Sequence, residues 1–214
     1  MTDFTASEVN ICNLALQQMG RDTRIASLAE TTTTAGPICA LQYPISRDAG
    51  LRAYPWNFAK IRATLTAHAE APDFEFDNYY KLPSDYLWLR TIFEAYDEPY
   101  KIETFSSSTS GVIRVIATNL GSPIYITYTS RISDPTLFDP LFITTLAAHI
   151  AAEIAVPLTE TRAKAQSLWQ VYQQKLIEAR RIDSQEDTAD PFPQGSWVDG
   201  RFSGQIAPYR DFVP

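Results

Sequence analysis

Residues 47–59 constrain the fold of this chain more than any other stretch, because a helical pattern ends inside them and a strand pattern begins. Pro55 disfavours helical dihedral angles at Tyr54, so a helix is predicted to end there. From Phe58 onward apolar and polar residues alternate, which is typical of a half-buried strand. The stretch is therefore predicted to join helices on its amino-terminal side to a sheet on its carboxyl-terminal side.

Two helices are predicted before this junction. Thr5 and Glu8 have the spacing of a capping box, so the first helix is expected to start at Thr5 and to end near Gly20. The second helix is expected to end at Tyr54 and to kink at Pro44, because proline removes a backbone donor and crowds the preceding turn.

Strand patterns follow the junction, and two helical patterns follow the strands. The strand patterns predict a small antiparallel sheet and cover residues 58–68, 79–82, 87–93, 100–104, 112–117 and 124–129. Residues 141–156 are apolar nearly all round, which predicts a central helix that Pro157 stops, and residues 160–187 predict a long amphipathic helix. The sequence thus predicts an α+β protein, one compact unit with an insertion.

The composition predicts a folded, acidic and soluble protein. Aromatic residues make up 12% of the 214 residues, which favours a substantial core. A net charge of -7 argues against a surface that holds phosphate backbones, since such surfaces need clustered Lys and Arg. Cys12 and Cys39 lie in apolar helical patterns and are expected to be reduced and buried. The apolar run 141–156 contains His149 and Glu153 and is too short to span a bilayer, so no membrane partner is expected.

No catalytic constellation is recognised, so no enzyme activity, metal or cofactor is expected. His68 and His149 lie far apart without partners at metal-ligand spacing, which favours a structural or surface role over a metal or acid-base role. Asp73, Glu75 and Asp77 alternate with phenylalanines, and strand geometry would place these carboxylates on one face. A solvated face is favoured there, but a small carboxylate- or metal-dependent hydrolase remains an alternative.

The candidate residues of the junction itself are Trp56, Phe58 and Arg52. The two aromatic side chains fit either the lining of a ligand pocket or a plug that packs the helices against the sheet. The plug is favoured, because large aromatic residues between two layers of structure are more often core than site.

Two further segments are candidate contact sites. A polar run between two strand patterns is expected to form an exposed contact tip, and it consists of Ser106, Ser107, Ser108, Thr109 and Ser110. The C-terminal tail contains prolines and glycines that keep it extended, and its aromatic anchors are Phe192, Trp197, Phe202, Tyr209 and Phe212. Docking of this tail on another chain is favoured over packing on its own domain.

An ordered series of motifs runs along most of the chain. It consists of residues 11–20, 25–30, 47–59, 80–86, 132–135, 138–142, 147–155 and 166–179, together with Cys39 and Tyr43. This series resembles the tail tubular protein A family, the head-to-tail adaptors of short-tailed bacteriophages. Gly50 departs from the family's pattern, in which a bulkier helix former is expected.

The resemblance implies a four-helix bundle core, an inserted small antiparallel β-sheet domain and an extended C-terminal tail. The bundle would comprise residues 1–57 and 132–187, the inserted β domain residues 58–131 and the tail residues 188–214. The resemblance also implies a homo-oligomer, a dodecameric ring, built in the host cytoplasm and located in the phage tail of the virion.

Partners are implied by the same resemblance. The ring would lie between the portal protein and the tail nozzle, tail tubular protein B, with the tail fibres as a further candidate partner. Genome DNA would pass through the centre without specific binding, which suits an acidic chain. The last helix and the tail are expected to contact the portal, and the contact tip the nozzle or fibres. A monomeric interaction module remains a second alternative.

Overall fold

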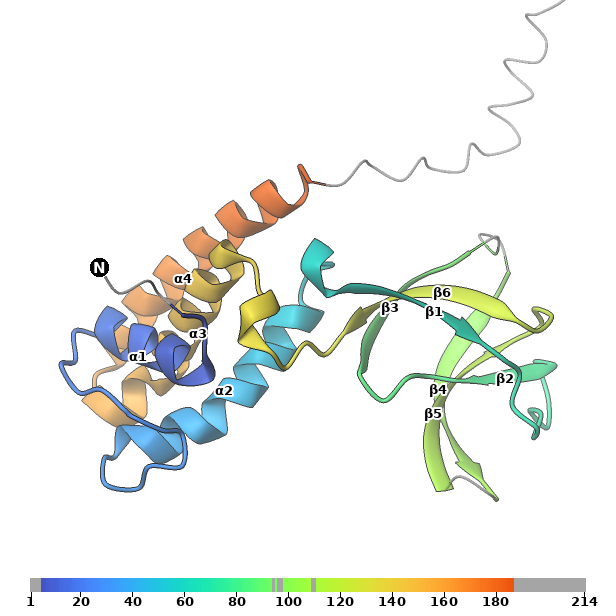
Figure 1. The fold of residues 1–214 in the computed structure, drawn as a ribbon, viewed down its shortest axis with the longest axis horizontal. Helices are drawn as coiled ribbons and strands as arrows, with labels where there is room; N and C mark the ends of the chain where they lie inside the picture. Colours follow the sequence, from blue (N-terminus) through green and yellow to red (C-terminus); the bar gives the residue numbers. More distant parts are fainter. Residues whose placement is uncertain (1–4, 94, 96–97, 109–110, 187–214) are drawn as a thin grey trace, which may run out of the picture.

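The computed structural model describes residues 5–93, 95, 98–108 and 111–186. Within them the helices gather at one end of the molecule and the strands at the other (Figure 1). The elements are, in chain order, α1 (Glu8–Gln18), α2 (Ala35–Arg52), the 3-10 turn η1 (Asn57–Ala59), β1 (Lys60–Leu65), β2 (Asn78–Lys81), β3 (Tyr86–Ile92), β4 (Tyr100–Ser107), β5 (Gly111–Thr118), β6 (Ile124–Ser130), the 3-10 turn η2 (Pro135–Leu137), α3 (Pro140–Thr159) and α4 (Arg162–Asp183).

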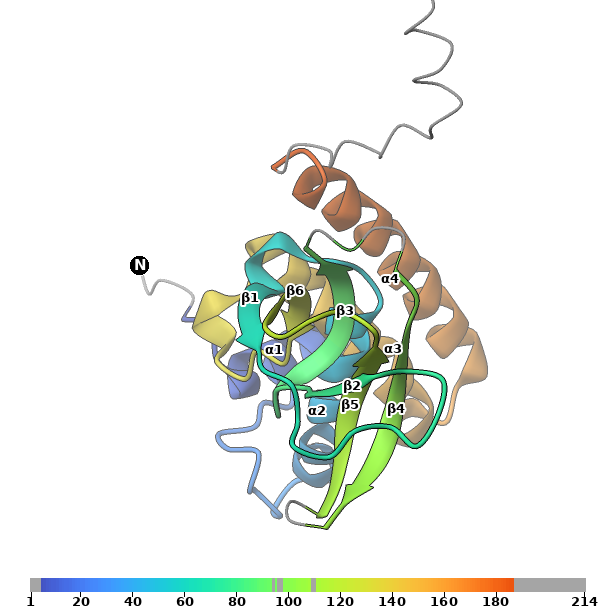
Figure 2. The same cartoon turned by 90° about the vertical axis from the view of Figure 1, so that its right-hand side faces the viewer.

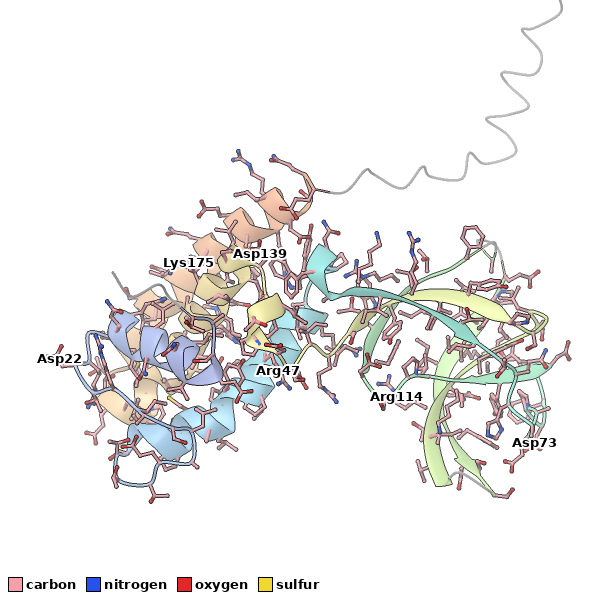
Figure 3. The ribbon with its side chains drawn as sticks, viewed as in Figure 1. Asp22, Arg47, Asp73, Arg114, Asp139 and Lys175 are labelled. Carbon is pink, nitrogen blue, oxygen red and sulfur yellow. The ribbon has the colours of Figure 1, made fainter. Side chains whose placement is uncertain are left out.

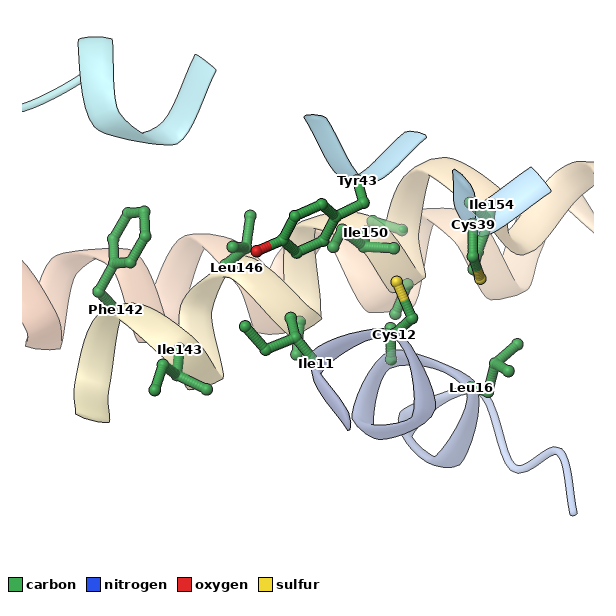
Figure 4. Close-up of a cluster of buried hydrophobic side chains, with 14 of the residues drawn as sticks. Ile11, Cys12, Leu16, Cys39, Tyr43, Phe142, Ile143, Leu146, Ile150 and Ile154 are labelled. Atoms are coloured by element: carbon green, nitrogen blue, oxygen red, sulfur yellow. The ribbon is translucent and has the colours of Figure 1, made fainter. Parts of the chain in front are cut away.

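Helix α3 is the centre of the helical part. Its buried side chains include Phe142, Leu146, Ile150 and Ile154, which lie among side chains of α1 and α2 (Figure 4). The expectation that this apolar segment is too short to span a bilayer is wrong, because the 20 residues of α3 are by length and composition sufficient to cross a membrane. However, 61% of its apolar window is buried inside the protein. The apolar character of α3 therefore matches its position in a core.

The prediction of a four-helix bundle core with an inserted sheet is wrong, although the α+β class is confirmed. Helix α1 has 11 residues against 20 in α3, so it cannot run along the full length of its neighbour. Helix α4 packs mainly on α3, and α1 contacts α2 only sparsely. The helices are thus arranged around α3 as a hub, whereas a bundle requires each helix to pack on its neighbours.

The strands form two sheets, where one small sheet was predicted. Both are three-stranded and antiparallel, with the orders β1-β6-β3 and β2-β5-β4 (Figure 2). Between them lies a second hydrophobic core that includes Leu65, Tyr80, Leu89, Ile116 and Ile126. Alternation indicates where a strand lies and that it buries one face, so the strand positions were predicted correctly. It does not indicate which strands share a sheet, so the division into two sheets around a core was not predicted.

Two expected helix ends differ from the structure. Ser7, not Thr5, caps α1, and its hydroxyl oxygen accepts the Asn10 amide at 3.1 Å. Helix α3 passes Pro157 and ends at Thr159, and its C-cap Glu160 has a left-handed φ of 56°. Pro44 lies inside α2, which runs as one helix from Ala35 to Arg52. A proline removes only its own backbone donor, and the last turn of α3 is held by the Glu160 amide donating to the Val156 carbonyl at 2.9 Å.

Cys12 of α1 and Cys39 of α2 are buried, unbridged and next to each other in the helical core (Figure 4). The hydrogen bond between the two thiols, together with burial, raises the pKa of Cys12. Both cysteines therefore serve as small core residues, as predicted.

Candidate functional site

The centre of the junction is an aromatic cluster around Trp56. Trp56 is only 1% exposed, and its ring centre lies 4.9 Å from that of Tyr54 and 5.1 Å from that of Phe142. The Phe58 ring lies 5.1 Å from the same Phe142 ring. Rings from the end of α2, from η1 and from the start of α3 thus fill the space where the helices meet the strands.

Gly50 of α2 packs against this aromatic cluster. A Cβ atom at this position would lie 3.4 Å from Cε2 of Phe142, in close van der Waals contact with the ring. The Gly50 carbonyl also accepts a hydrogen bond from the Trp56 indole nitrogen at 2.9 Å. The small residue therefore allows the plug to pack closely against α2.

Two arginines connect the helices to β3. Arg52, at the end of α2, donates from Nη1 to the Leu87 carbonyl at 2.6 Å. Arg90 of β3 donates from Nη2 to the Trp56 carbonyl at 2.5 Å and from Nε to the Thr129 hydroxyl at 3.0 Å. A guanidinium from each side of the junction therefore donates to a backbone carbonyl of the other side. Such charge-assisted hydrogen bonds fix the orientation of the helices relative to β3.

A third connection joins α2 to the end of β6. Arg131 donates from Nε to the Asp48 carboxylate at 2.8 Å, and Asp48 also pairs with Arg47 at 2.9 Å. Arg47 lies in the helical part of the molecule (Figure 3). The roles of Arg90, Arg131 and Asp48 were not predicted from the sequence. The one available signal was an arginine inside the mostly apolar strand pattern 87–93.

The end of α4 is fixed to the same junction. Asp183 is 6% exposed, and its carboxylate accepts the Asn57 amide at 3.0 Å, while its carbonyl accepts the Asn57 side-chain amide at 2.7 Å. The Tyr54 hydroxyl donates to the Arg180 carbonyl at 3.2 Å. Burial raises the pKa of Asp183, and the Asn57 amide opposes that shift.

A groove of about 1040 Å³ lies between this end of α4 and the outer face of the sheet β1-β6-β3. Its lining includes three large aromatic side chains, which are 39%, 61% and 52% exposed for Trp88, Phe93 and Tyr125. The remaining lining residues are Tyr54, Pro55, Asn57, Lys60, Arg62, Ala63, Thr64, Arg90, Thr91, Ile126, Thr127, Asp183 and Ser184. This groove was not predicted from the sequence, because its walls come from segments far apart in the chain.

The candidate carboxylate cluster is not formed. Asp73, Glu75 and Asp77 lie in the connection between β1 and β2, outside any strand, and Glu75 has a left-handed φ of 72°. The Glu75 carboxylate pairs with Lys101 of β4 at 2.5 Å, and Asp73 lies at the end of the strand region away from the helices (Figure 3). In the described part of the chain, no three His, Cys, Asp or Glu side chains gather as metal ligands. The hydrolase alternative gains no support from this geometry.

The two histidines occupy separate structural positions. His68 accepts the Glu70 amide at 3.2 Å and lies edge-on to Phe105. His149 of α3 stacks on Tyr172 of α4 with ring centres 4.7 Å apart. Burial lowers the pKa of His149, and Glu153, 3.7 Å away, opposes that shift.

The predicted contact tip is partly outside the described residues. Ser107 is buried at the end of β4, and Ser106 is exposed. The Ser108 amide donates to Glu70 at 3.1 Å and its hydroxyl bonds the same carboxylate, which lowers the pKa of Glu70. Thr109 and Ser110, and all five aromatic residues of the predicted tail, lie outside the described residues.

The site as a whole consists of a hydrogen-bonded junction around Trp56 and an adjoining groove. Arg52 and Arg90 make structural hydrogen bonds, and exposed aromatic side chains line a groove. No protein-family model matches the chain, and a search of curated proteins found no match.

Proposed function

We propose that this protein is a structural virion protein, a head-to-tail adaptor that forms a dodecameric ring between a phage portal and its tail nozzle. Genome DNA passes through the ring without specific binding. The observation that carries the proposal is the exposure of apolar side chains on two different helices of the helical part. A ring of identical copies needs such a pair of surfaces, since each copy meets its two neighbours through different faces.

The first surface lies on α2. Leu41 and Ile45, one helical turn apart, are 69% and 57% exposed. Exposed leucine and isoleucine side chains at positions i and i+4 form an apolar patch on the helix surface. A partner typically packs on such a patch.

The second surface lies on α4, which packs mainly on α3 and leaves its outer side open. Its exposed large hydrophobic side chains include Val171 and Ile182, which share one face of the helix, and Ile177, which lies on another. Ile177 is the most exposed of them, at 68%. We infer that the α2 surface of one copy contacts the α4 surface of the next.

The position of the family motifs also supports the proposal. The motif residues Ile11, Tyr43, Trp56 and Ile150 are all buried in the same hydrophobic core. Part of the resemblance therefore rests on residues of the helical core.

The assembly is tested with the double variant Leu41→Glu and Ile45→Glu in the full chain. Two carboxylates in the α2 surface should abolish ring formation in the presence of portal, as measured by light scattering after size-exclusion chromatography. A matched control is Val112→Glu on β5, where the side chain is 74% exposed and lies outside both surfaces. Rings formed equally well by the double variant would exclude the α2 surface from the interface.

Portal binding is tested through the tail. Replacement of Phe192, Trp197 and Phe202 by serine in the full chain should weaken pull-down by portal rings while leaving the fold unchanged, because aromatic side chains serve as anchors at interfaces. Circular dichroism provides the control for folding. Undiminished pull-down would remove the tail from the portal contact.

A further inference from the structure

The groove described above has a distinct chemical character. Three of its lining residues are cationic, Lys60, Arg62 and Arg90, and one is acidic, Asp183, so the lining carries a balance of three minus one, or two positive charges. This contrasts with the net charge of -7 for the whole chain. The groove is therefore a locally basic surface on an acidic protein.

The strand register shows how these groups are spaced. On the outer face of the sheet, Arg62 pairs with Thr127, and Thr64 pairs with Tyr125. The Phe93 amide donates to the Tyr125 carbonyl at 2.8 Å, so the two exposed rings lie on neighbouring strands at the end of the sheet away from the helices. Cations and aromatic rings thus follow each other along the groove, which suits an extended, acidic and aromatic ligand.

The segment 187–214 of the same chain has this composition. It contains Asp187, Asp190, Asp199 and Asp211 against Arg201 and Arg210, which gives four minus two, or two negative charges. It also contains five of the chain's large aromatic side chains, beginning with Phe192 and Trp197. Its charge and its aromatic content therefore complement those of the groove.

The segment also starts beside the groove. Asp183 and Ser184, the last residue and the C-cap of α4, are themselves part of the lining, and Asp183 is held there by Asn57. From Ser184 to Phe192 an extended chain spans roughly 26 Å, at ~3.3 Å per residue. A strand with the 6 residues of β1 covers only about 20 Å. Phe192 can therefore reach any point along the groove.

We propose that residues 187–214 dock in the groove of their own chain, with Phe192 and Trp197 against the exposed rings and the aspartates toward Arg62 and Lys60. The segment is attached to α4, so docking within one chain is favoured over docking between chains. A short linker gives the segment an effective concentration of about millimolar at the groove of its own chain. Residues 187–214 are docked in this groove before the chain meets a partner. This inference goes beyond the adaptor function and does not depend on it.

The docking is tested by photo-crosslinking in the full chain without portal. The photoreactive residue p-benzoylphenylalanine replaces Tyr125 in the groove, which is 52% exposed. The matched control carries it in place of Tyr100, which is 45% exposed and lies on β4 in the other sheet. Irradiation followed by peptide mass spectrometry should give adducts with peptides from 187–214 at position 125 and not at position 100.

A mixture of unlabelled and ¹⁵N-labelled chains distinguishes the origin of the docked segment. Adducts within single-isotope chains support the proposal. Mixed-isotope adducts, or a position-125 variant without adducts to 187–214, overturn it.

A charge variant provides an independent measurement. Arg62→Glu, combined with the photoreactive residue at position 125, should lower the adduct yield by roughly fivefold, the effect of reversing one exposed charge pair. Lys81→Glu, at an exposed position on β2 in the other sheet, is the control and should leave the yield unchanged. Equal yields from the two variants would contradict the charge complementarity.

Discussion

Two aromatic clusters lie close together in this protein and differ in almost every physical respect. The plug of Trp56, Phe58 and Phe142 lies inside the junction, with rings in contact and the Trp56 ring almost fully buried. The groove cluster is spread along the outer face of β1-β6-β3, with Trp88 at the end near the helices and Phe93 and Tyr125 at the far end, and each of the three side chains is more than a third exposed.

The difference teaches that burial, not residue type, decides what an aromatic side chain contributes. A buried ring stabilises the fold through the apolar area that it removes from water. The apolar area of an exposed ring is removed from water only when a partner binds, so it stabilises the complex. Arg90 connects the two clusters, because it lines the groove and donates to the Trp56 carbonyl. Substitutions on the two sides should therefore separate stability from binding.

The largest expected effect is that of Trp56→Ala. Removal of a buried tryptophan leaves a cavity and should lower the free energy of unfolding by ~3–5 kcal/mol, as measured by urea denaturation. The matched control is the same substitution at Trp88 in the groove, which should cost far less. Equal losses at the two positions would contradict the contrast between plug and groove.

Arg90→Met should have the next largest effect. It leaves the Trp56 carbonyl and the Thr129 hydroxyl without their charged donor, so the free energy of unfolding should fall by ~1.5–3 kcal/mol. Arg62→Met, on β1 of the same sheet, should change stability by no more than ~0.5 kcal/mol. The connection through Arg90 would be refuted by an unchanged denaturation midpoint.

The effect of pH at His149 is smaller. Because the pKa of folded His149 lies below its ordinary value of 6.5, the unfolded chain binds a proton at this residue first as the pH falls. The stability that neutral His149 contributes is thus present above pH 6.5 and is lost as the pH decreases through the folded pKa. His149→Gln should reduce the loss of stability between neutral and mildly acidic pH, and an unchanged pH profile would contradict the shift.

The smallest expected effect on stability is that of Phe93→Ser. The side chain is 61% exposed, so the free energy of unfolding should stay within ~0.5 kcal/mol of the original value. The same variant should nevertheless reduce crosslinking between position 125 and residues 187–214. A marked loss of stability would show that the groove cluster belongs to the core.

The sequence predicted those features that depend on local pattern. Alternation located the six strands, and the position of Trp56 and Phe58 between two kinds of pattern placed them at the junction. The hub arrangement of the helices was not predictable, because the amphipathic pattern of α4 shows which face is buried but not which helix covers it.

The groove and the arginine connections were missed for a related reason. Arg90 meets Trp56 across 34 positions of sequence, and Arg131 meets Asp48 across 83. Nothing in a single sequence indicates such pairs. The Asp73, Glu75 and Asp77 pattern failed because Glu75 adopts a left-handed φ that ends the strand alternation on which the interpretation rested.

The central claim, that this chain is a ring-forming adaptor, is tested most directly by mass photometry of the full chain mixed with portal rings. The proposal predicts one new species whose mass exceeds that of the portal ring by a dodecamer of this chain. Portal rings of unchanged mass beside free monomer would contradict it.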